Sequence, residues 1–276
     1  MKIFILSLPK DADRRAHMIE QLSKAGILDY EFVDGVDCRG KAEEELEGIF
    51  NLRRFKTIHS VYPTAGEIGC ALGHYKIWRR CLESGDNGPW LIMEDDLTIH
   101  PGFYEKLDAL KKWMRNSEKP IGLTFCYFCV YHSFKTIAEI KMAEDVDAAG
   151  AYCYTLNRRA VEALIELGAP HYLADDWKYF RKFMKVFVAM DATVSHDGIF
   201  ASNIERSVVF DSDDKSLKSK IQVIAHILPR ILLYKVGYYK VFQADKNLHL
   251  TGVMRMALKR RLNNLLKKFC GIRKKS

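Results

Sequence analysis

Short apolar runs alternate with segments of helical spacing along this chain, and this alternation constrains the fold most. The run Ile3 to Leu8 is apolar, residues 13–25 carry apolar side chains at helical spacing, and Tyr30 to Val33 is apolar again. A strand, a helix and a strand in this order form a βαβ unit, whose strands lie in one sheet. The first forty residues therefore predict an α/β fold.

The same alternation continues beyond the first unit. Further helices are expected over 68–82, 103–114, 158–167 and 174–184, strands over 90–93, 121–131, 151–155 and 186–190, and a helical or mobile charged insertion over 41–56. No linker precedes residue 215, and the pattern is helical from Leu217 onward. We predict one α/β domain over 1–215, with a mostly parallel sheet flanked by helices, and a helical, basic extension over 216–276.

The charges are distributed unevenly. All 35 acidic residues lie at or before Asp245, whereas ten of the 43 lysines and arginines follow it, so the last 31 residues carry +10 and the rest carries −2. A chain that is basic throughout, such as a histone-like protein, is excluded, and no nucleic-acid partner is expected.

The sequence indicates a cytosolic protein. Its longest stretch without Asp, Glu, Lys or Arg is the fifteen residues from Pro120 to Phe134, whereas a spanning helix needs about 20. The apolar start ends at Pro9 and lacks the apolar core of a secretory signal. Seven cysteines without regular spacing fit a reducing compartment.

Three acids, Glu94, Asp95 and Asp96, directly follow the apolar strand 90–93. Ligands of open α/β sheets bind at the carboxyl ends of strands. Positions 94 and 96 would share a face there and together hold a divalent cation, for which carboxylates suit Mg²⁺ or Mn²⁺. A solvated strand end with helix-capping acids explains the same motif, and the motif alone leaves both interpretations open.

A second acidic pair, Asp175 and Asp176, opens a predicted helix. An N-cap with a neighbouring acid is the common role of such a pair. The functional alternative is that one carboxylate caps the helix and the other is a general base. We discount two other motifs: Cys126 and Cys129 as core packing, and Asp211 to Asp214 as a polar loop.

Several of these segments in combination resemble glycosyltransferase family 25, the lipopolysaccharide and lipooligosaccharide transferases. The resemblance covers residues 1–210 and is carried by Ile5-Leu6-Ser7-Leu8 with Asp13-Arg14-Arg15, Gly66-Glu67-Ile68-Gly69-Cys70 with His74 and Trp78, Glu94-Asp95-Asp96, and Gly150-Ala151-Tyr152 before Arg158. It implies a GT-A fold, a UDP-sugar donor (galactose first, glucose second), Mn²⁺ or Mg²⁺, and inverting transfer to a lipooligosaccharide or lipopolysaccharide acceptor.

The resemblance also assigns residues. It makes Asp176, or else Asp175, the general base, and it makes Asp96, Glu94 and His196 the metal ligands. The nucleotide-sugar is assigned to Ser7, Leu8, Arg15, Asp34, Val36, Glu67, Gly69, His74, Glu94, Asp95 and Asp96. Family members usually have serine at the position of Gly73, so we expect a hydroxyl contact to be missing here.

A different class of function uses the tail alone. Leu258, Leu262, Leu265, Leu266 and Phe269 form an apolar stripe on a basic helix, which is typical of binding to an anionic membrane surface. The competing prediction is a non-enzymatic peripheral module bound to the membrane through 252–276. For the enzyme, the same tail predicts a peripheral location on the cytosolic face of the inner membrane.

Overall fold

A computed structural model describes residues 1–59, 61–125, 128–131, 133–144, 147–190, 193–196, 199–200 and 240–243. The predicted basic extension lies outside these residues, apart from 240–243, as does the Asp211 to Asp214 motif.

The body is built on an eight-stranded sheet. Its strands run in the order β2 (Glu31–Asp34), β1 (Lys2–Ser7), β3 (Trp90–Glu94), β10 (Cys153–Leu156), β5 (Ile121–Phe125), β11 (Lys185–Ala189), β8 (Ile140–Glu144) and β7 (Phe134–Ile137). β1 is parallel to β2 and β3, and β11 is parallel to β5, whereas β10 and β8 are antiparallel to their neighbours. The sheet is mixed and largely parallel, which confirms the predicted α/β class.

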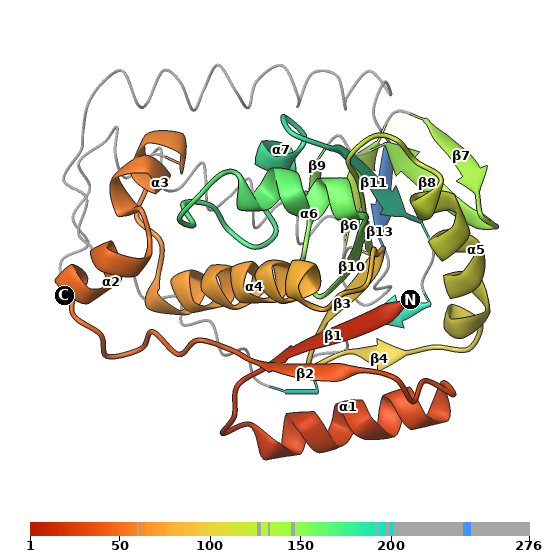
Figure 1. The fold of residues 1–276 in the computed structure, drawn as a ribbon, viewed down its shortest axis with the longest axis horizontal. Helices are drawn as coiled ribbons and strands as arrows, with labels where there is room; N and C mark the ends of the chain where they lie inside the picture. The colour runs from red at the N-terminus through yellow and green to blue at the C-terminus, as the bar shows by residue number, and fades with distance from the viewer. Residues whose placement is uncertain are drawn as a thin grey trace, which may run out of the picture.

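Helices cover both faces of the sheet (Figure 1). One face packs on α1 (Ala12–Lys24) and α5 (Phe103–Arg115), and the other on α4 (Ala65–Glu83), α6 (Arg158–Ile165) and α7 (Trp177–Phe180). In β1, Ile3 and Ile5 belong to the first core, whereas Phe4 and Leu6 belong to the second. Burial on both faces explains why this strand is a continuous apolar run.

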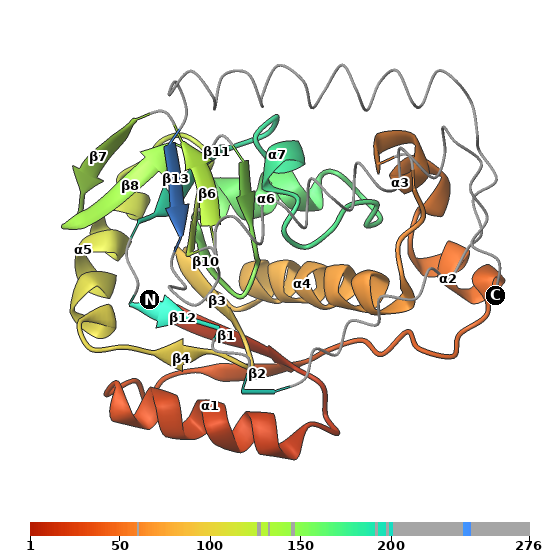
Figure 2. The ribbon, with the colours of Figure 1, turned by 180° about the vertical axis from the view of Figure 1, so that it is seen from behind.

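Two smaller sheets complete the body (Figure 2). One contains β6 (Phe128–Tyr131), β9 (Asp147–Ala149) and β13 (Lys240–Gln243), and the other pairs β4 (Thr98–Ile99) with β12 (Val194–Ser195). The predicted single run over 121–131 is therefore wrong, because β5 pairs within the large sheet and β6 within a small one. The predicted helix over 174–184 is also too long, since α7 has four residues.

The insertion after β2 folds as α2 (Glu43–Ile49) and α3 (Leu52–His59). The segment leading into it passes very close to α4. A Cβ on Gly69 would lie 2.3 Å from the Val36 carbonyl oxygen, which is shorter than any real contact. Only glycine fits at this crossing without a backbone shift, so the predicted pocket residues Val36 and Gly69 do lie against each other.

We expect Gly69→Ala to lower the free energy of unfolding by about 1–3 kcal/mol, because the added methyl group overpacks a backbone contact. The matched control is Gly48→Ala in α2, where a Cβ meets nothing within 4 Å and alanine is favoured by about 0.5–1 kcal/mol. Urea unfolding of both variants measures the difference. Equal effects of the two substitutions would contradict the crossing described above.

Candidate active site

The carboxyl ends of three adjacent strands form the edge at which the predicted residues gather. In the register of the sheet, Ser7 of β1 lies beside Asp34 of β2, and Leu6 lies beside Glu94 of β3. The loops that follow these strands therefore open on one side of the sheet, where ligands of α/β proteins bind.

Arg15 of α1 joins two of these strand ends. Its Nε donates a hydrogen bond to the Ser7 hydroxyl at 3.2 Å, and its Nη2 lies 2.6 Å from Asp34 Oδ1. The half-buried Leu8 lies against Gly35, where an added Cβ would meet Leu8 Cδ2 at 3.2 Å. The structure thus brings four residues predicted for the nucleotide pocket into one cluster.

The neighbouring Arg14 holds the two aspartates together. Its Nη1 donates to Asp95 Oδ1 at 2.9 Å and to Asp96 Oδ2 at 2.8 Å, and all three residues are buried. The pairing of β12 with β4 carries the following residue, His196, to Asp96, with 3.0 Å between His196 Nε2 and Asp96 Oδ2. Sequence reasoning did not assign Arg14 to the site, although it noted the Asp13-Arg14-Arg15 segment at the start of this helix.

These contacts shift the pKa values in different directions. Burial raises the pKa of Asp95, and hydrogen bonds from Ser7 and Arg14 only partly oppose this. Burial also raises the pKa of Asp96, but the hydrogen bond and charge of His196, together with Arg14, outweigh it and leave the net pKa below its usual value. The hydrogen bond to Asp96 is the main reason why the pKa of His196 is raised. Asp96 and His196 therefore each favour the charged form of the other.

Glu94 faces α4 instead. Its Oε1 lies 3.2 Å from His74 Nε2 and accepts a hydrogen bond from the Cys70 thiol at 4.0 Å. On the far side of His74, Nδ1 lies 2.8 Å from the Tyr154 hydroxyl, to which Trp78 donates at 2.9 Å.

Metal-ligating atoms converge at this position. In the part of the chain that the structure describes, the group whose ligand atoms all lie within 4.8 Å of one another is Cys70, His74 and Glu94. The predicted set of Glu94, Asp96 and His196 shares only Glu94 with it. Positions 94 and 96 therefore do not present one shared cation site, because Glu94 contacts α4 while Asp96 contacts α1 and His196.

The second acidic pair divides between two partners. Asp175 Oδ2 accepts the Gly150 backbone N–H at 3.0 Å, while Asp176 Oδ2 lies 3.0 Å from His59 Nε2 of α3. Asp176 occupies the N-cap position of α7, but its side chain makes no capping hydrogen bond. The side-chain cap that both interpretations of this pair assumed is therefore absent, although Asp176 does occupy the N-cap position.

Glu67, predicted to bind the nucleotide-sugar, caps a helix. Its Oε2 accepts the Thr64 N–H at 2.7 Å, and its own N–H donates to the Thr64 hydroxyl at 3.2 Å. The spacing Thr-x-x-Glu is the sequence pattern of a capping box and would have predicted this role.

Gly73, further along the same helix, faces the core: a Cβ there would meet Leu6 Cδ1 at 2.8 Å. A serine at position 73 would thus face β1, which corrects the expectation of a missing hydroxyl contact to substrate.

Cys70 of α4 lies near acids of both groups, the one after β3 and the one before α7. Burial raises the pKa of its thiol well above the usual value, and the negative charges of nearby carboxylates raise it further: Glu94, Asp175, Asp96 and Glu67. The segment 150–152 also joins the two groups, because the Gly150 N–H donates to Asp175 and the Tyr152 carbonyl accepts the Glu94 N–H. Glu94 and Asp175 therefore both lie near Cys70.

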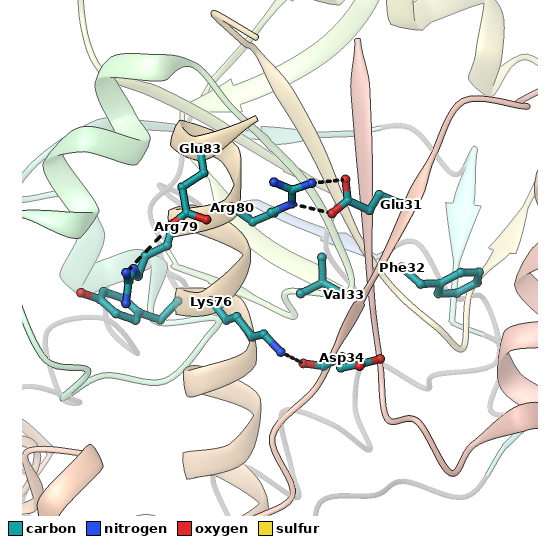
Figure 3. Close-up of a pocket in the computed structure, with 9 residues that line it drawn as sticks. Glu31, Phe32, Val33, Asp34, Lys76, Arg79, Arg80 and Glu83 are labelled. Atoms are coloured by element: carbon teal, nitrogen blue, oxygen red, sulfur yellow. Dashed lines mark hydrogen bonds and ion pairs between the residues drawn. The ribbon is translucent and has the colours of Figure 1, made fainter. Parts of the chain in front are cut away.

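An open cavity of about 480 Å³ lies beside this site, between β2 and α4 (Figure 3). Arg80 binds Glu31 through Nε at 2.6 Å and Nη2 at 3.2 Å, and Lys76 Nζ donates to the Asp34 carbonyl at 2.9 Å. These contacts fasten the outer strand β2 to α4, and so fix the backbone that presents Asp34.

Comparison with known proteins shows which family the chain matches. Residues 1–178 match the family model described as glycosyltransferase family 25 (LPS biosynthesis protein). The chain belongs to glycosyltransferase family 25. The resemblance predicted from the strand-end motifs is confirmed, and the match includes both acidic groups.

Relatives in glycosyltransferase family 25 come from diverse sources. A mimivirus protein (Acanthamoeba polyphaga mimivirus), named as glycosyltransferase R655, is 27% identical over 178 residues, or 60% of this chain and 52% of its own length. The lipooligosaccharide biosynthesis protein lic2B of Haemophilus influenzae is 25% identical over 65% of this chain and 70% of its own. Human procollagen galactosyltransferase 2 is 31% identical over 40% of this chain and 18% of its own. The chain thus spans about half of the viral relative and a smaller part of the human enzyme.

The membrane and cysteine predictions for this family member can be compared with its described residues. No helix within the described ranges is both long and apolar enough to cross a membrane. The five cysteines that the structure describes are unpaired. Of the pair discounted as packing, Cys129 is buried in a core cluster, whereas Cys126 lies outside the described residues.

Asp175 offers a test of the electrostatics of the site. Burial raises the pKa of this carboxyl, so its ionised form is less stable in the folded protein than in the unfolded chain. Asp175→Asn keeps an acceptor for Gly150 and removes the charge. We expect the variant to have the higher melting temperature at pH 7, with the gain vanishing below about pH 4, where both states hold a protonated carboxyl. A wild-type protein that is more stable at pH 7 would contradict this.

Proposed function

We propose that this family member transfers a hexose from a UDP-sugar to an oligosaccharide acceptor of the lipooligosaccharide or lipopolysaccharide class, with inversion and with a GT-A arrangement of donor and acceptor. Galactose is the first candidate for the hexose and glucose the second. The observation that carries the proposal is that an acid after β3, Glu94, and an acid before α7, Asp175, both lie near Cys70 of α4. Both are needed: one set of acids for the donor and one carboxylate for the acceptor.

The proposed general base is Asp176. An acceptor hydroxyl is a poor nucleophile, so a carboxylate must take its proton while the bond to the anomeric carbon forms. Asp175 Oδ2 already accepts a backbone N–H, whereas Asp176 Oδ2 lies 3.0 Å from His59 Nε2 but has no hydrogen-bond partner. No donor therefore competes with the acceptor hydroxyl for this oxygen of Asp176.

The proposed donor pocket is the cluster at the ends of β1 and β2. Arg15 orients Ser7 and Asp34, whose oxygen atoms can accept hydrogen bonds from a nucleoside. Inversion requires the leaving diphosphate and the base on opposite faces of the sugar ring. The diphosphate is therefore assigned to the side of Asp95 and Asp96, and the acceptor to the side of α7.

The divalent cation that the family implies can be tested against the donor atoms. Asp96 Oδ1 is buried and has no hydrogen-bond partner, and His196 already lies beside the other oxygen of this carboxylate. A buried carboxylate oxygen without a partner fits a cation ligand. We assign Mn²⁺ or Mg²⁺ to Asp96 and His196, where the bound ion would supply positive charge for the departing diphosphate. Arg14 would hold Asp95 and Asp96 in position.

Ligand-induced stabilisation separates this proposal from a non-enzymatic module. UDP with Mn²⁺ should raise the melting temperature. At a free ligand concentration of 100 times the Kd, binding stabilises the folded state by about 2.7 kcal/mol, and EDTA should abolish the metal-dependent part. The matched control is UDP in metal-free buffer. An unchanged melting temperature at saturating UDP and Mn²⁺ would favour the module.

A peripheral membrane location is a separate proposal that depends on the basic tail. Residues 252–276 carry the apolar stripe and nine of the ten bases that follow Asp245, and each base near an anionic surface contributes about 1 kcal/mol. Removing 252–276 should release the protein from anionic vesicles in a sedimentation assay and leave UDP-sugar hydrolysis intact. Binding to vesicles that persists after the truncation would contradict it.

A further inference from the structure

Three metal-ligating side chains meet beside the proposed donor site and have no joint role in the mechanism above. His74 Nε2 lies 3.2 Å and Cys70 Sγ lies 4.0 Å from Glu94 Oε1, and the three atoms all lie within 4.8 Å of one another. In a tetrahedral zinc site, metal–ligand bonds of about 2.0–2.3 Å place neighbouring ligand atoms about 3.2–3.7 Å apart. A small contraction of this cluster would therefore create a three-ligand zinc site.

The fold fixes these ligands on rigid elements. Cys70 and His74 are four residues apart on α4, so they share one face of the helix, as do the two histidines of helical zinc motifs. Glu94 is the last residue of β3 and points at that face. This spacing is a sequence signal that could have been recognised, although the pairing with Glu94 depends on the fold.

His74 also has the supporting contact that zinc-binding histidines usually have. Its Nδ1 lies 2.8 Å from the Tyr154 hydroxyl, which accepts a hydrogen bond from Trp78. All three side chains are buried. A partner on one ring nitrogen fixes the ring and directs the other nitrogen to the metal, here toward Glu94.

The surroundings favour a cation. Asp175, Asp96 and Glu67 act electrostatically on Cys70 in addition to Glu94. The Glu94 side chain is 26% exposed, which leaves a path from solvent to the cluster. Sulfur and imidazole ligands select a softer ion than the oxygen ligands that suit Mn²⁺ or Mg²⁺.

We propose that Cys70, His74 and Glu94 bind a thiophilic divalent ion, Zn²⁺ foremost, at a site separate from Asp96 and His196, and that the bound ion inhibits the transferase by occupying His74 and Glu94, two of the residues predicted to bind the nucleotide-sugar. Binding displaces the thiol proton of Cys70 to solvent and forms a sulfur–zinc bond. His74 then binds through Nε2 and carries its proton on Nδ1, facing Tyr154. No electron transfer is involved. The inhibition rests on the proposed transferase activity, whereas the binding does not.

Cobalt titration of the full chain tests the binding directly, because a Co²⁺–thiolate bond has a charge-transfer absorption that oxygen ligands do not produce. The wild-type protein should bind one Co²⁺ with this band and lose the band when Zn²⁺ is added. Cys70→Ser should abolish the band and weaken Zn²⁺ binding by at least about 100-fold, and Tyr154→Phe should weaken it by about 10–100-fold. Cys81→Ala, which removes another buried thiol from α4, should retain the band.

Controls separate this site from the proposed Mn²⁺ site. Asp96→Asn should retain the cobalt–thiolate band, and thermal unfolding checks that each variant is folded. Absence of the band in the wild-type protein, or a band that persists in Cys70→Ser, would overturn the site. Zinc bound through Cys70 with undiminished UDP-hexose turnover would overturn the inhibitory part. Failure of every UDP-hexose as a donor would refute the transferase proposal and leave the cobalt result standing.

Discussion

Asp176→Asn is expected to lower the turnover number by about 10²–10⁴-fold, the usual contribution of a general base, with a smaller change in KM for the donor. Asparagine keeps the size of the side chain and cannot take the proton of the acceptor hydroxyl. Steady-state kinetics with a confirmed donor and acceptor measure the effect. Thermal unfolding checks that the variant is folded, because the substitution alters the 3.0 Å contact with His59 between α3 and the start of α7.

Asp175→Asn is the matched control for this prediction. It removes a neighbouring carboxylate but retains an acceptor for the Gly150 N–H, so turnover should fall much less than in Asp176→Asn. The opposite order, with Asp176→Asn near the wild-type rate and Asp175→Asn inactive, would exchange the two assignments. Loss in neither variant would remove this acidic pair from the mechanism.

Arg14→Met is expected to lower the free energy of unfolding by about 3–5 kcal/mol, because breaking a buried ion pair leaves its partners uncompensated. Arg14 Nη1 contacts Asp95 and Asp96 at 2.9 and 2.8 Å, and all three side chains are at most 9% exposed. Methionine keeps much of the side-chain volume and removes the charge. Urea unfolding at neutral pH measures the loss.

Arg15→Met is the control from the adjacent position. Its ion pair with Asp34 is largely solvent-accessible, with Asp34 57% exposed, so the expected loss is about 0–1 kcal/mol. Adding Asp95→Asn to Arg14→Met should recover part of the lost stability, because one of the two carboxylates that lost Arg14 is then neutral. Equal losses for the two arginine variants would show that burial of the Arg14 cluster contributes nothing.

Local patterns predicted the elements that are long and periodic. The helices at 103–115 and 65–83 and the strand at 90–94 were expected within a few residues, since their apolar side chains face a core at a regular interval. The hairpin of β8 and β7 escaped prediction because β7 is mostly exposed and lacks an apolar run. The 121–131 run was misjudged because apolar content does not reveal where a chain leaves one sheet for another.

The site was predictable in its residues but less so in its pairings. Motifs identified the acids of both groups, and the α/β pattern implied that they face one edge. Whether Glu94 lies with Asp96 or with His74 depends on the packing of α4 against β3, which no local motif encodes. Arg14 and Tyr154 were missed for the same reason: each acts on a partner about 80 residues away in the chain.

Release of UDP from UDP-hexoses in the presence of Mn²⁺ tests the central claim most directly. The wild-type protein should release UDP from UDP-galactose or UDP-glucose, and an acceptor should accelerate the release. Asp96→Asn, folded as judged by thermal unfolding, should be slower by about 10²–10³-fold, because it weakens the charge that stabilises the leaving diphosphate. A folded wild-type protein that turns over neither sugar nucleotide, or an Asp96→Asn variant as fast as wild type, would contradict the account.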